Sequence, residues 1–220
     1  MIEFHHVYKT YPGPTHALKN IDLSIAKGEF VFLTGPSGAG KTTLFKMISA
    51  FDKVTSGQLS VAEFNLNNLN AENTQIYRRR IGIVFQDFKL LKDRTIFENV
   101  ALPLQIRNEK KSFIEDRVHQ VLKQVGLENK FDQFPDFLSG GEQQRTAIAR
   151  AIIHQPGVLI ADEPTGNLDP QLSEEIMDLF ETVSEQGTTI FLATHDLAMV
   201  ERRKKRTLKL IAGQIAEDQK

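Results

Sequence analysis

The sequence predicts an α/β fold: a parallel-sheet core, an N-terminal antiparallel β subdomain and a helical insertion. Short apolar runs without alternation stand at residues 30–33, 158–161 and 189–193, as in strands that are buried on both faces. A helical segment at 171–186 separates the last two runs, and strand–helix–strand order places such strands parallel in one sheet. A glycine-rich loop also follows the first run and precedes a helical segment, which is the arrangement of a nucleotide-binding core.

The remaining elements complete this prediction in chain order. Up to about residue 25, short alternating segments surround Pro12, Gly13 and Pro14, which indicates a small antiparallel sheet with turns. A strand at 81–85 ends at Gln86, and most of 87–155 is expected to be helical, with Gly126 suited to a helix end. We therefore expect one domain over 1–220, with a core lobe at about 1–86 and 156–220 and a helical lobe at about 87–155.

Composition excludes several classes of function. The 27 basic and 28 acidic residues give a net charge of -1, which argues against a protein that binds nucleic acid with its whole surface. The absence of cysteine excludes disulfides, thiolate metal sites and a cysteine nucleophile. The N-terminus lacks the pattern of a secretion signal, and no apolar stretch approaches the roughly 20 residues that cross a bilayer. We expect any membrane contact to come through a partner.

The glycine-rich loop matches the phosphate-binding P-loop pattern G-x-x-x-x-G-K-[ST] in full. Glycines let backbone N–H groups surround phosphate oxygens, and the next helix adds its positive N-terminal end. The lysine is expected to reach the β- and γ-phosphates, and the threonine hydroxyl to bind Mg²⁺. A chance glycine turn is the alternative, which the flanking strand and helix disfavour. The predicted nucleotide-binding residues are Gly35, Pro36, Ser37, Gly38, Ala39, Gly40, Lys41, Thr42 and Thr43.

Two carboxylates, Asp162 and Glu163, follow the apolar run at 158–161. Acidic groups at the end of a buried strand are costly unless a cation or a hydrogen-bond donor meets them. In a P-loop protein the first carboxylate holds the Mg²⁺ shell and the second polarises the attacking water. An acidic strand end or helix cap is the alternative.

Ser139, Gly140 and Gly141 stand at a predicted helix start. Alone, they read as a helix cap with a flexible lead-in. The same hydroxyl and free N–H groups also suit a second phosphate. Two phosphate-binding loops far apart in one chain require an explanation.

The P-loop, the LSGGE run at 138–142 and the IADEPTGNLD run at 160–169 together resemble the ATP-binding cassette (ABC) ATPases over essentially the whole chain. The resemblance implies a P-loop NTPase of the ABC nucleotide-binding type that hydrolyses ATP with Mg²⁺. It also implies a homodimer formed head to tail on ATP binding. Each ATP would then lie between one chain's P-loop and the other chain's signature residues, which would explain the two phosphate-binding loops.

The resemblance also implies roles for residues outside the P-loop. Tyr11 would stack on adenine, Gln86 would contact Mg²⁺ and the attacking water, and His195 would contact the γ-phosphate. Catalysis would involve Glu163, His195, Gln86 and Lys41, and the Mg²⁺ ligands would be Thr42, Gln86 and Asp162. A packed aromatic, a polar strand end and a structural histidine are the alternatives for Tyr11, Gln86 and His195.

A loop at 167–169 would communicate across the dimer. The sequence departs from the commonest family pattern at two positions, where Glu142 replaces glutamine and Asn167 replaces serine or alanine. Neither departure involves the phosphate-binding signature residues.

Within the family, residues 85–104 are informative, with an LLKDRT run followed by NVALPL. They resemble the ATPases of bacterial cell-division complexes, which implies pairing with an integral membrane protein at the cytoplasmic face of the cell membrane. ATP-driven motion would then regulate cell-wall hydrolases. The ATPase of a lipoprotein-releasing or macrolide-type exporter is the main alternative. A soluble DNA-repair or translation protein and an ATP-switched scaffold remain as further classes.

A histidine pair and two basic clusters are weaker signals of function. His5 and His6 are adjacent on a predicted strand and point to opposite faces, so they do not predict a metal site. The basic clusters at 78–80 and 202–206 are interpreted as a solvated face or as a contact for an anionic membrane or an acidic partner.

Overall fold

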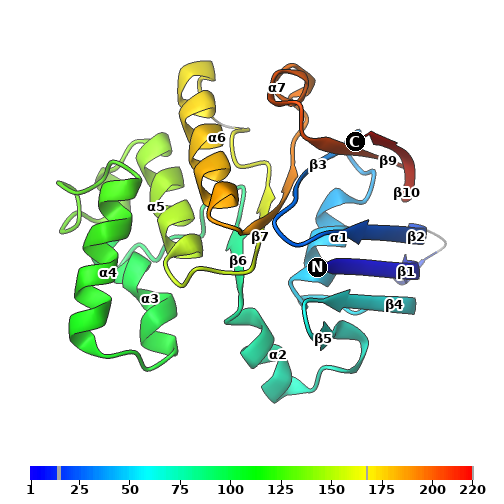
Figure 1. The fold of residues 1–220 in the computed structure, drawn as a ribbon, viewed down its shortest axis with the longest axis horizontal. Coiled ribbons are helices and arrows are strands. Elements are labelled where there is room, and N and C mark those ends of the chain that lie inside the picture. Colours follow the sequence, from blue (N-terminus) through cyan, green and yellow to red (C-terminus); the bar gives the residue numbers. More distant parts are fainter. Residues whose placement is uncertain (14–15, 167, 220) are drawn as a thin grey trace.

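A computed structural model describes residues 1–13, 16–166 and 168–219, and it contains two sheets and a group of helices (Figure 1). The larger sheet has the strand order β10–β9–β3–β8–β7–β6, in which all neighbours are parallel except the β9–β10 pair. Its strands are β3 (Phe30–Thr34), β6 (Ile81–Val84), β7 (Val158–Asp162), β8 (Thr189–Ala193), β9 (Arg206–Ile211) and β10 (Gln214–Gln219). The predicted parallel core is confirmed.

The smaller sheet is antiparallel and has the order β2–β1–β4–β5. Its strands are β1 (Ile2–Thr10), β2 (His16–Ile25), β4 (Ser56–Val61) and β5 (Phe64–Asn65). This is the N-terminal β subdomain that the sequence predicted. Of the predicted turn, Pro14 lies outside the described residues.

α3, α4, α5 and α6 pack on one face of the larger sheet, with α3, α4 and α5 together at the left of Figure 1, whereas α1 packs on the other face together with the antiparallel sheet. α3 begins at a full capping box, in which Thr95 and Glu98 bond each other's backbone N–H groups. No helix among the described residues is long and apolar enough to cross a membrane. The helices are α1 (Lys41–Ile48), α2 (Ala71–Arg78), α3 (Ile96–Ile106), α4 (Lys111–Gln124), α5 (Gly140–Ile152), α6 (Pro170–Glu185) and α7 (Leu197–Arg203), with 3₁₀ turns at Leu66–Asn68 and Pro135–Phe137.

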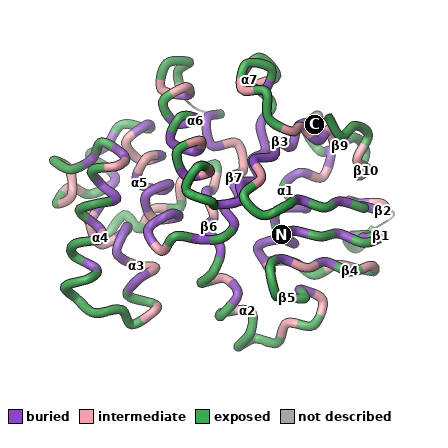
Figure 2. Tube along the Cα trace, in the orientation of Figure 1, coloured by how far each residue is buried: buried purple, intermediate pink, exposed green. Residues whose placement is uncertain are grey.

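The larger sheet separates two apolar cores, which explains its unbroken apolar strands. In β3, Phe30 and Phe32 pack into the core shared with α3–α6, whereas Val31 and Leu33 pack into the core shared with α1 and the antiparallel sheet. Figure 2 shows the central strands buried along their length. Because successive side chains of a strand point to opposite faces, a strand between two cores carries apolar residues at every position.

The C-terminal basic cluster differs from its interpretation as a solvated or partner-binding face. Residues 202–206 cover the end of α7 and the start of β9, and the side chains of Arg203 and Arg206 are only 12% and 11% exposed. Arg206 bonds both carboxylate oxygens of Asp218 at 2.7 Å and Glu29 at 2.9 Å. Arg203 and Arg206 therefore form ion pairs within the chain, since a buried guanidinium requires carboxylate partners.

Arg78 and the two N-terminal histidines also have local partners. The guanidinium of Arg78 lies 4.3 Å from the ring centre of Phe51 and donates to the backbone carbonyl of Ala50. His6 contacts Asn20 at 3.0 Å, and the described residues hold no cluster of three metal-binding side chains.

Candidate functional site

The P-loop joins β3 to α1 and fits closely against two other strands. Gly35 has φ 143°, and a Cβ there would lie 2.1 Å from the carbonyl oxygen of Leu210 in β9. Gly40 has φ 110°, and its Cβ would lie 2.8 Å from the carbonyl oxygen of Ala17 in β2. Only glycine combines these backbone conformations with such close approach. The loop's path is thus set by neighbouring strands as well as by its own sequence.

The ammonium group of Lys41 lies inside this loop. Its Nζ donates to the carbonyl oxygens of Gly35 at 2.7 Å and Pro36 at 3.2 Å, and the residue is only 8% exposed. α1 starts at Gly40 without any side-chain cap, so no side chain accepts from its first N–H groups. A buried cation beside an uncapped helix start is an arrangement that binds phosphate.

A cavity of about 790 Å³ opens over the loop, within the usual size range of ligand sites. It brings together most of the predicted site residues, although they come from four separate segments of the chain. Its lining includes Gly35, Pro36, Ser37, Gly38, Ala39, Gly40, Lys41, Thr42, Thr43, Gln86, Asp162, Glu163 and His195.

The end of β7 supplies oxygen atoms suited to a divalent cation. The hydroxyl of Thr42 donates to Asp162 Oδ2 at 3.0 Å, across 120 residues of sequence. Burial raises the pKa of Asp162 above its usual value, and the Thr42 hydrogen bond partly offsets this effect. Gln86 lines the same cavity. A hydroxyl, a carboxylate and an amide oxygen are ligands that suit Mg²⁺, which takes few protein groups and completes its shell with water and phosphate.

Glu163 and His195 form a contact pair beside that site. His195 Nδ1 lies 3.1 Å from Glu163 Oε2, and the Glu163 N–H donates to the carbonyl of Ala193 at 2.9 Å. The backbone of Glu163 has φ 48°, a left-handed conformation that is uncommon outside glycine. Strained backbone of this kind is found at functional sites, where neighbouring structure enforces it. The arrangement can orient a water molecule and accept its proton.

The segment after Gln86 is held by an arginine that the sequence analysis missed. Phe88 and Lys89 both have positive φ, at 58° and 49°. Arg150 in α5 donates to both of their carbonyl oxygens at 2.7 Å, and burial lowers the pKa of its guanidinium. Its signal in the sequence was a lone cation inside the apolar run AIARAI.

Tyr11 does not line the P-loop cavity itself. Its hydroxyl donates to Asp52 Oδ2 at 2.6 Å, and Lys9 Nζ lies 4.8 Å from its ring centre. The ring is 38% exposed and lines a neighbouring pocket that shares Thr42 and Asp162 with the cavity. Stacking of Tyr11 on adenine stays a prediction.

The start of α5 differs from the start of α1, because a capping box satisfies the backbone N–H groups of Ser139 and Glu142. The hydroxyl of Ser139 accepts from the Glu142 N–H, and the Glu142 carboxylate accepts from the Ser139 N–H at 2.9 Å. These bonds and Lys130, 3.4 Å away, keep the pKa of Glu142 below its usual value. Neither Ser139 nor the two glycines that follow it line the P-loop cavity.

The last predicted segment, the loop at 167–169, is described in part. Asn167 lies outside the described residues. Asp169 caps α6 by accepting from the Leu172 N–H at 3.0 Å. A Cβ at Gly141 would lie 2.1 Å from the Leu172 side chain, so α5 and α6 approach closely beside this loop.

Comparisons with known proteins agree with this geometry. Residues 18–166 match the family model described as "ABC transporter". The chain is 49% identical over 219 residues to the "Cell division ATP-binding protein FtsE" of Bacillus subtilis, covering 100% of this chain and 96% of the relative. It is 46% identical to the Escherichia coli K12 protein of the same name, covering 98% and 97%. A solved dimeric, post-hydrolysis structure of an ATP-binding cassette bound to ADP and Pi matches with TM-score 0.92 and 38% identity, covering 100% and 98%.

Proposed function

The chain belongs to the ABC transporter family, and we propose that it is the ATP-binding and ATP-hydrolysing subunit of a bacterial cell-division complex. The observation that carries this proposal is the gathering of Lys41, Thr42, Asp162, Glu163 and His195 at one cavity. The names of the full-length relatives support the cell-division role. The relatives reported above carry the cell-division name and not that of a lipoprotein-releasing or macrolide-type exporter, which is the alternative.

Within the cavity, each group has a distinct task. Lys41 and the N–H groups at the start of α1 bind the phosphates of ATP. Thr42, Asp162 and Gln86 would hold Mg²⁺, which neutralises charge on the β- and γ-phosphates when bound. Glu163 orients the attacking water and accepts its proton, while His195, hydrogen-bonded to Glu163, keeps that carboxylate in place and faces the γ-phosphate.

The second phosphate-binding loop acts in a homodimer. Ser139, Gly140 and Gly141 are outside the cavity of their own chain, so in this proposal they complete the site of a second copy. ATP binding brings the copies together head to tail, and hydrolysis lets them separate. The dimeric, ADP- and Pi-bound structure of a similar cassette supports this arrangement.

The helical lobe at about 87–155 is proposed to contact an integral membrane protein resembling FtsX. The chain would then lie at the cytoplasmic face of the cell membrane and reach the bilayer through that partner. Co-purification from membranes tests this step. Recovery with an exporter-type permease in place of an FtsX-like protein would exclude the cell-division role and leave the ATPase role intact.

The dimer is tested by Glu163→Gln. This variant keeps the size of the side chain and one acceptor oxygen but loses its ability to accept a proton, so it should bind ATP and remain dimeric. Light scattering with MgATP measures the molar mass, and the same variant with ADP is the control. A monomer with bound MgATP would exclude the head-to-tail dimer.

A further inference from the structure

The helix that follows His195 has little apolar contact of its own. α7 is only seven residues long, and its buried residues are Met199 and Val200. Helices this short are not stable alone, because nucleation costs more than a few hydrogen bonds return. The position of α7 therefore depends on what fastens it to the rest of the molecule.

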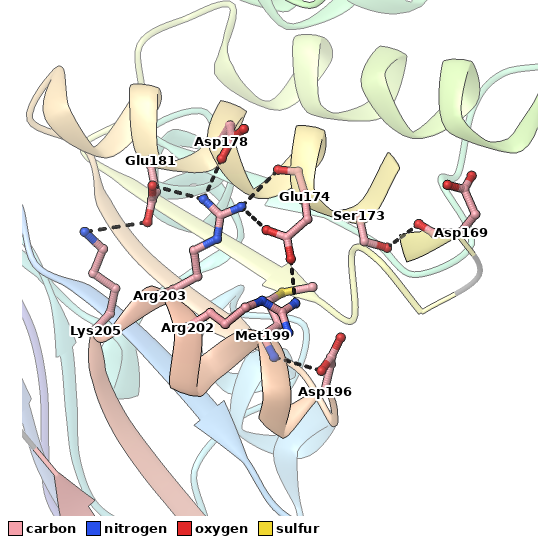
Figure 3. Close-up of polar contacts among 10 residues, drawn as sticks. All are labelled: Asp169, Ser173, Glu174, Asp178, Glu181, Asp196, Met199, Arg202, Arg203 and Lys205. Carbon is pink, nitrogen blue, oxygen red and sulfur yellow. Dashed lines mark hydrogen bonds and ion pairs between the residues drawn. The ribbon is translucent and has the colours of Figure 1, made fainter. Parts of the chain in front are cut away.

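Arg203, the last residue of α7, provides this attachment. Its Nη1 lies 2.5 Å from Asp178 Oδ1 and 3.2 Å from Glu181 Oε2, and its Nη2 bonds the carboxylate of Glu174 (Figure 3). The three carboxylates lie on α6 with spacings of four and three residues, and hence on one face of that helix. A planar guanidinium can bond several oxygens in fixed directions, which a single ammonium cannot do.

The neighbouring cations strengthen the same attachment. Arg202 bonds the other oxygen of Glu174 at 2.5 Å, and Lys205 lies 3.6 Å from Glu181. The bonds from Arg202 and Arg203 keep the pKa of Glu174 below its usual value. Of these cations only Arg203 is largely buried, at 12% exposed against 57% for Arg202 and 39% for Lys205. Arg203 also pairs with three carboxylates, whereas Arg202 and Lys205 each pair with one, so Arg203 makes the main contribution.

The beginning of α7 is rigidly connected to His195. The side chain of Asp196 caps α7 by accepting from the Met199 N–H at 2.9 Å, and its own N–H donates to Thr194 at 3.1 Å. His195 stands between these two anchored residues. Any shift of α7 along α6 would therefore move the imidazole that contacts Glu163.

The beginning of α6 faces the same place. Asp169 caps α6, and its carbonyl accepts from the Ser173 hydroxyl at 2.9 Å. A cavity of about 280 Å³ lies between the two helix starts. Its lining includes Glu163, Leu168, Ser173, His195, Asp196 and Arg202. The attachment of α7 to α6 thus sets the width of the space behind the catalytic pair.

We propose that Arg203 is a positioning residue for ATP hydrolysis, which fastens α7 to α6 and so holds His195 against Glu163. Arg203 touches neither residue, so it acts through α7 and Asp196. The inference rests on the proposed ATPase function. We expect Arg203 to affect the rate of the chemical step and not the binding of ATP, because its hydrogen bonds go to α6 and none goes to the P-loop.

The test is Arg203→Met, which keeps most of the aliphatic chain and removes the ion pairs. We expect kcat for MgATP hydrolysis by the purified chain to fall about 3- to 30-fold, the range for coupling through packed side chains. KM for ATP and the dissociation constant for ADP should change by less than about twofold, since ground-state binding is not involved. Arg203→Lys keeps the charge and should recover part of the rate.

A double-mutant cycle separates positioning from a general loss of stability. Glu174→Gln should lower kcat in the same way, and the double variant should be little worse than Arg203→Met, because both remove one contact. Arg80→Met is the matched control. Arg80 follows α2 and also pairs with a carboxylate, that of Glu63, but both side chains are exposed. This variant should leave kcat unchanged.

The outcomes are distinct. A wild-type chain that binds but does not hydrolyse MgATP would contradict the proposed function itself. Wild-type hydrolysis matched by Arg203→Met would overturn only the role of Arg203. A lysine variant as slow as the methionine variant, with thermal stability lowered in proportion, would also overturn it, because Arg203 would then merely brace the fold.

Discussion

The starts of α1 and α5 are both glycine-containing turns into helices, yet they have opposite surroundings. The α1 start has no side-chain cap, and Lys41, Thr42 and Asp162 lie around it. The α5 start is capped by its own Ser139 and Glu142. Exposed N–H groups bind an anion where nothing in the chain satisfies them first. The first region is thus a prepared phosphate site within one chain, whereas we propose that the second region completes the site of a second copy.

The α5 start also carries its own negative charge. In the proposed dimer, Glu142 would lie near the phosphate that approaches this helix start, and Lys130 lies 3.4 Å from its carboxylate. Neutral glutamine, which the family commonly has at this position, would not repel a phosphate. In this chain Lys130 partly offsets that repulsion, because an opposite charge close by reduces the local field.

The largest difference between the two regions should appear in nucleotide binding by one chain. Lys41→Met removes the cation from the P-loop and should weaken MgATP binding on the order of 100-fold, as for loss of one buried charged donor. Ser139→Arg should leave this affinity unchanged, since Ser139 is outside the cavity. Titration calorimetry on dilute protein measures both. Equal losses would show that the α5 start belongs to the same chain's site.

Mixing those two variants tests how the regions combine. Alone, each variant should be nearly inactive, because every shared site contains one defect. An equal mixture places both defects in one site of the mixed dimer and leaves the other intact, so roughly one quarter of the wild-type rate should return. Phosphate release measures it, and each variant at doubled concentration is the control. No recovery would contradict the shared site.

A smaller effect, on kcat, is expected where α5 contacts the segment that follows Gln86. Arg150 lies in α5, which Ser139 caps, and donates to the carbonyl oxygens of Phe88 and Lys89 in the segment after Gln86. Arg150→Met should displace Gln86 and lower kcat by about tenfold, as misplacement by a fraction of an ångström does. MgATP affinity should fall less than kcat, because Thr42 and Asp162 would still hold Mg²⁺. Lys111→Met, which alters a side chain 92% exposed, is the matched control for the helical lobe.

The smallest effect concerns charge at the α5 start. In the Glu163→Gln background, Lys130→Gln should weaken the ATP-bound dimer by about two- to fivefold, within the range of exposed ion pairs. Glu142→Gln should reverse that loss, because no carboxylate then needs compensation. Sedimentation at low and high salt measures both, and high salt should reduce the difference. If the dimer is still weakened when Lys130→Gln and Glu142→Gln are combined in the Glu163→Gln background, charge compensation by Lys130 is excluded.

The pattern of residues was sufficient for the core of the fold. Apolar runs predicted β3, β7 and β8 because strands between two cores admit few polar residues. β9 and β10 were not predicted, because the short alternation TLKLI directly follows the charged residues at 202–206. Arg203 and Arg206, which the sequence analysis placed at a surface, pair with carboxylates that lie 12, 29 and 177 residues away in the chain.

The sequence by itself determined the chemistry of the site. A glycine loop that ends in Lys41 and Thr42, and carboxylates after a buried strand, are local patterns whose residue types have few other uses. Only the tertiary structure decided which groups meet. The bond between Thr42 and Asp162, the contact of Glu163 with His195, and the attachment of Arg203 to α6 join segments distant along the chain. Such contacts depend on how strands and helices pack, and local sequence carries no information about that geometry.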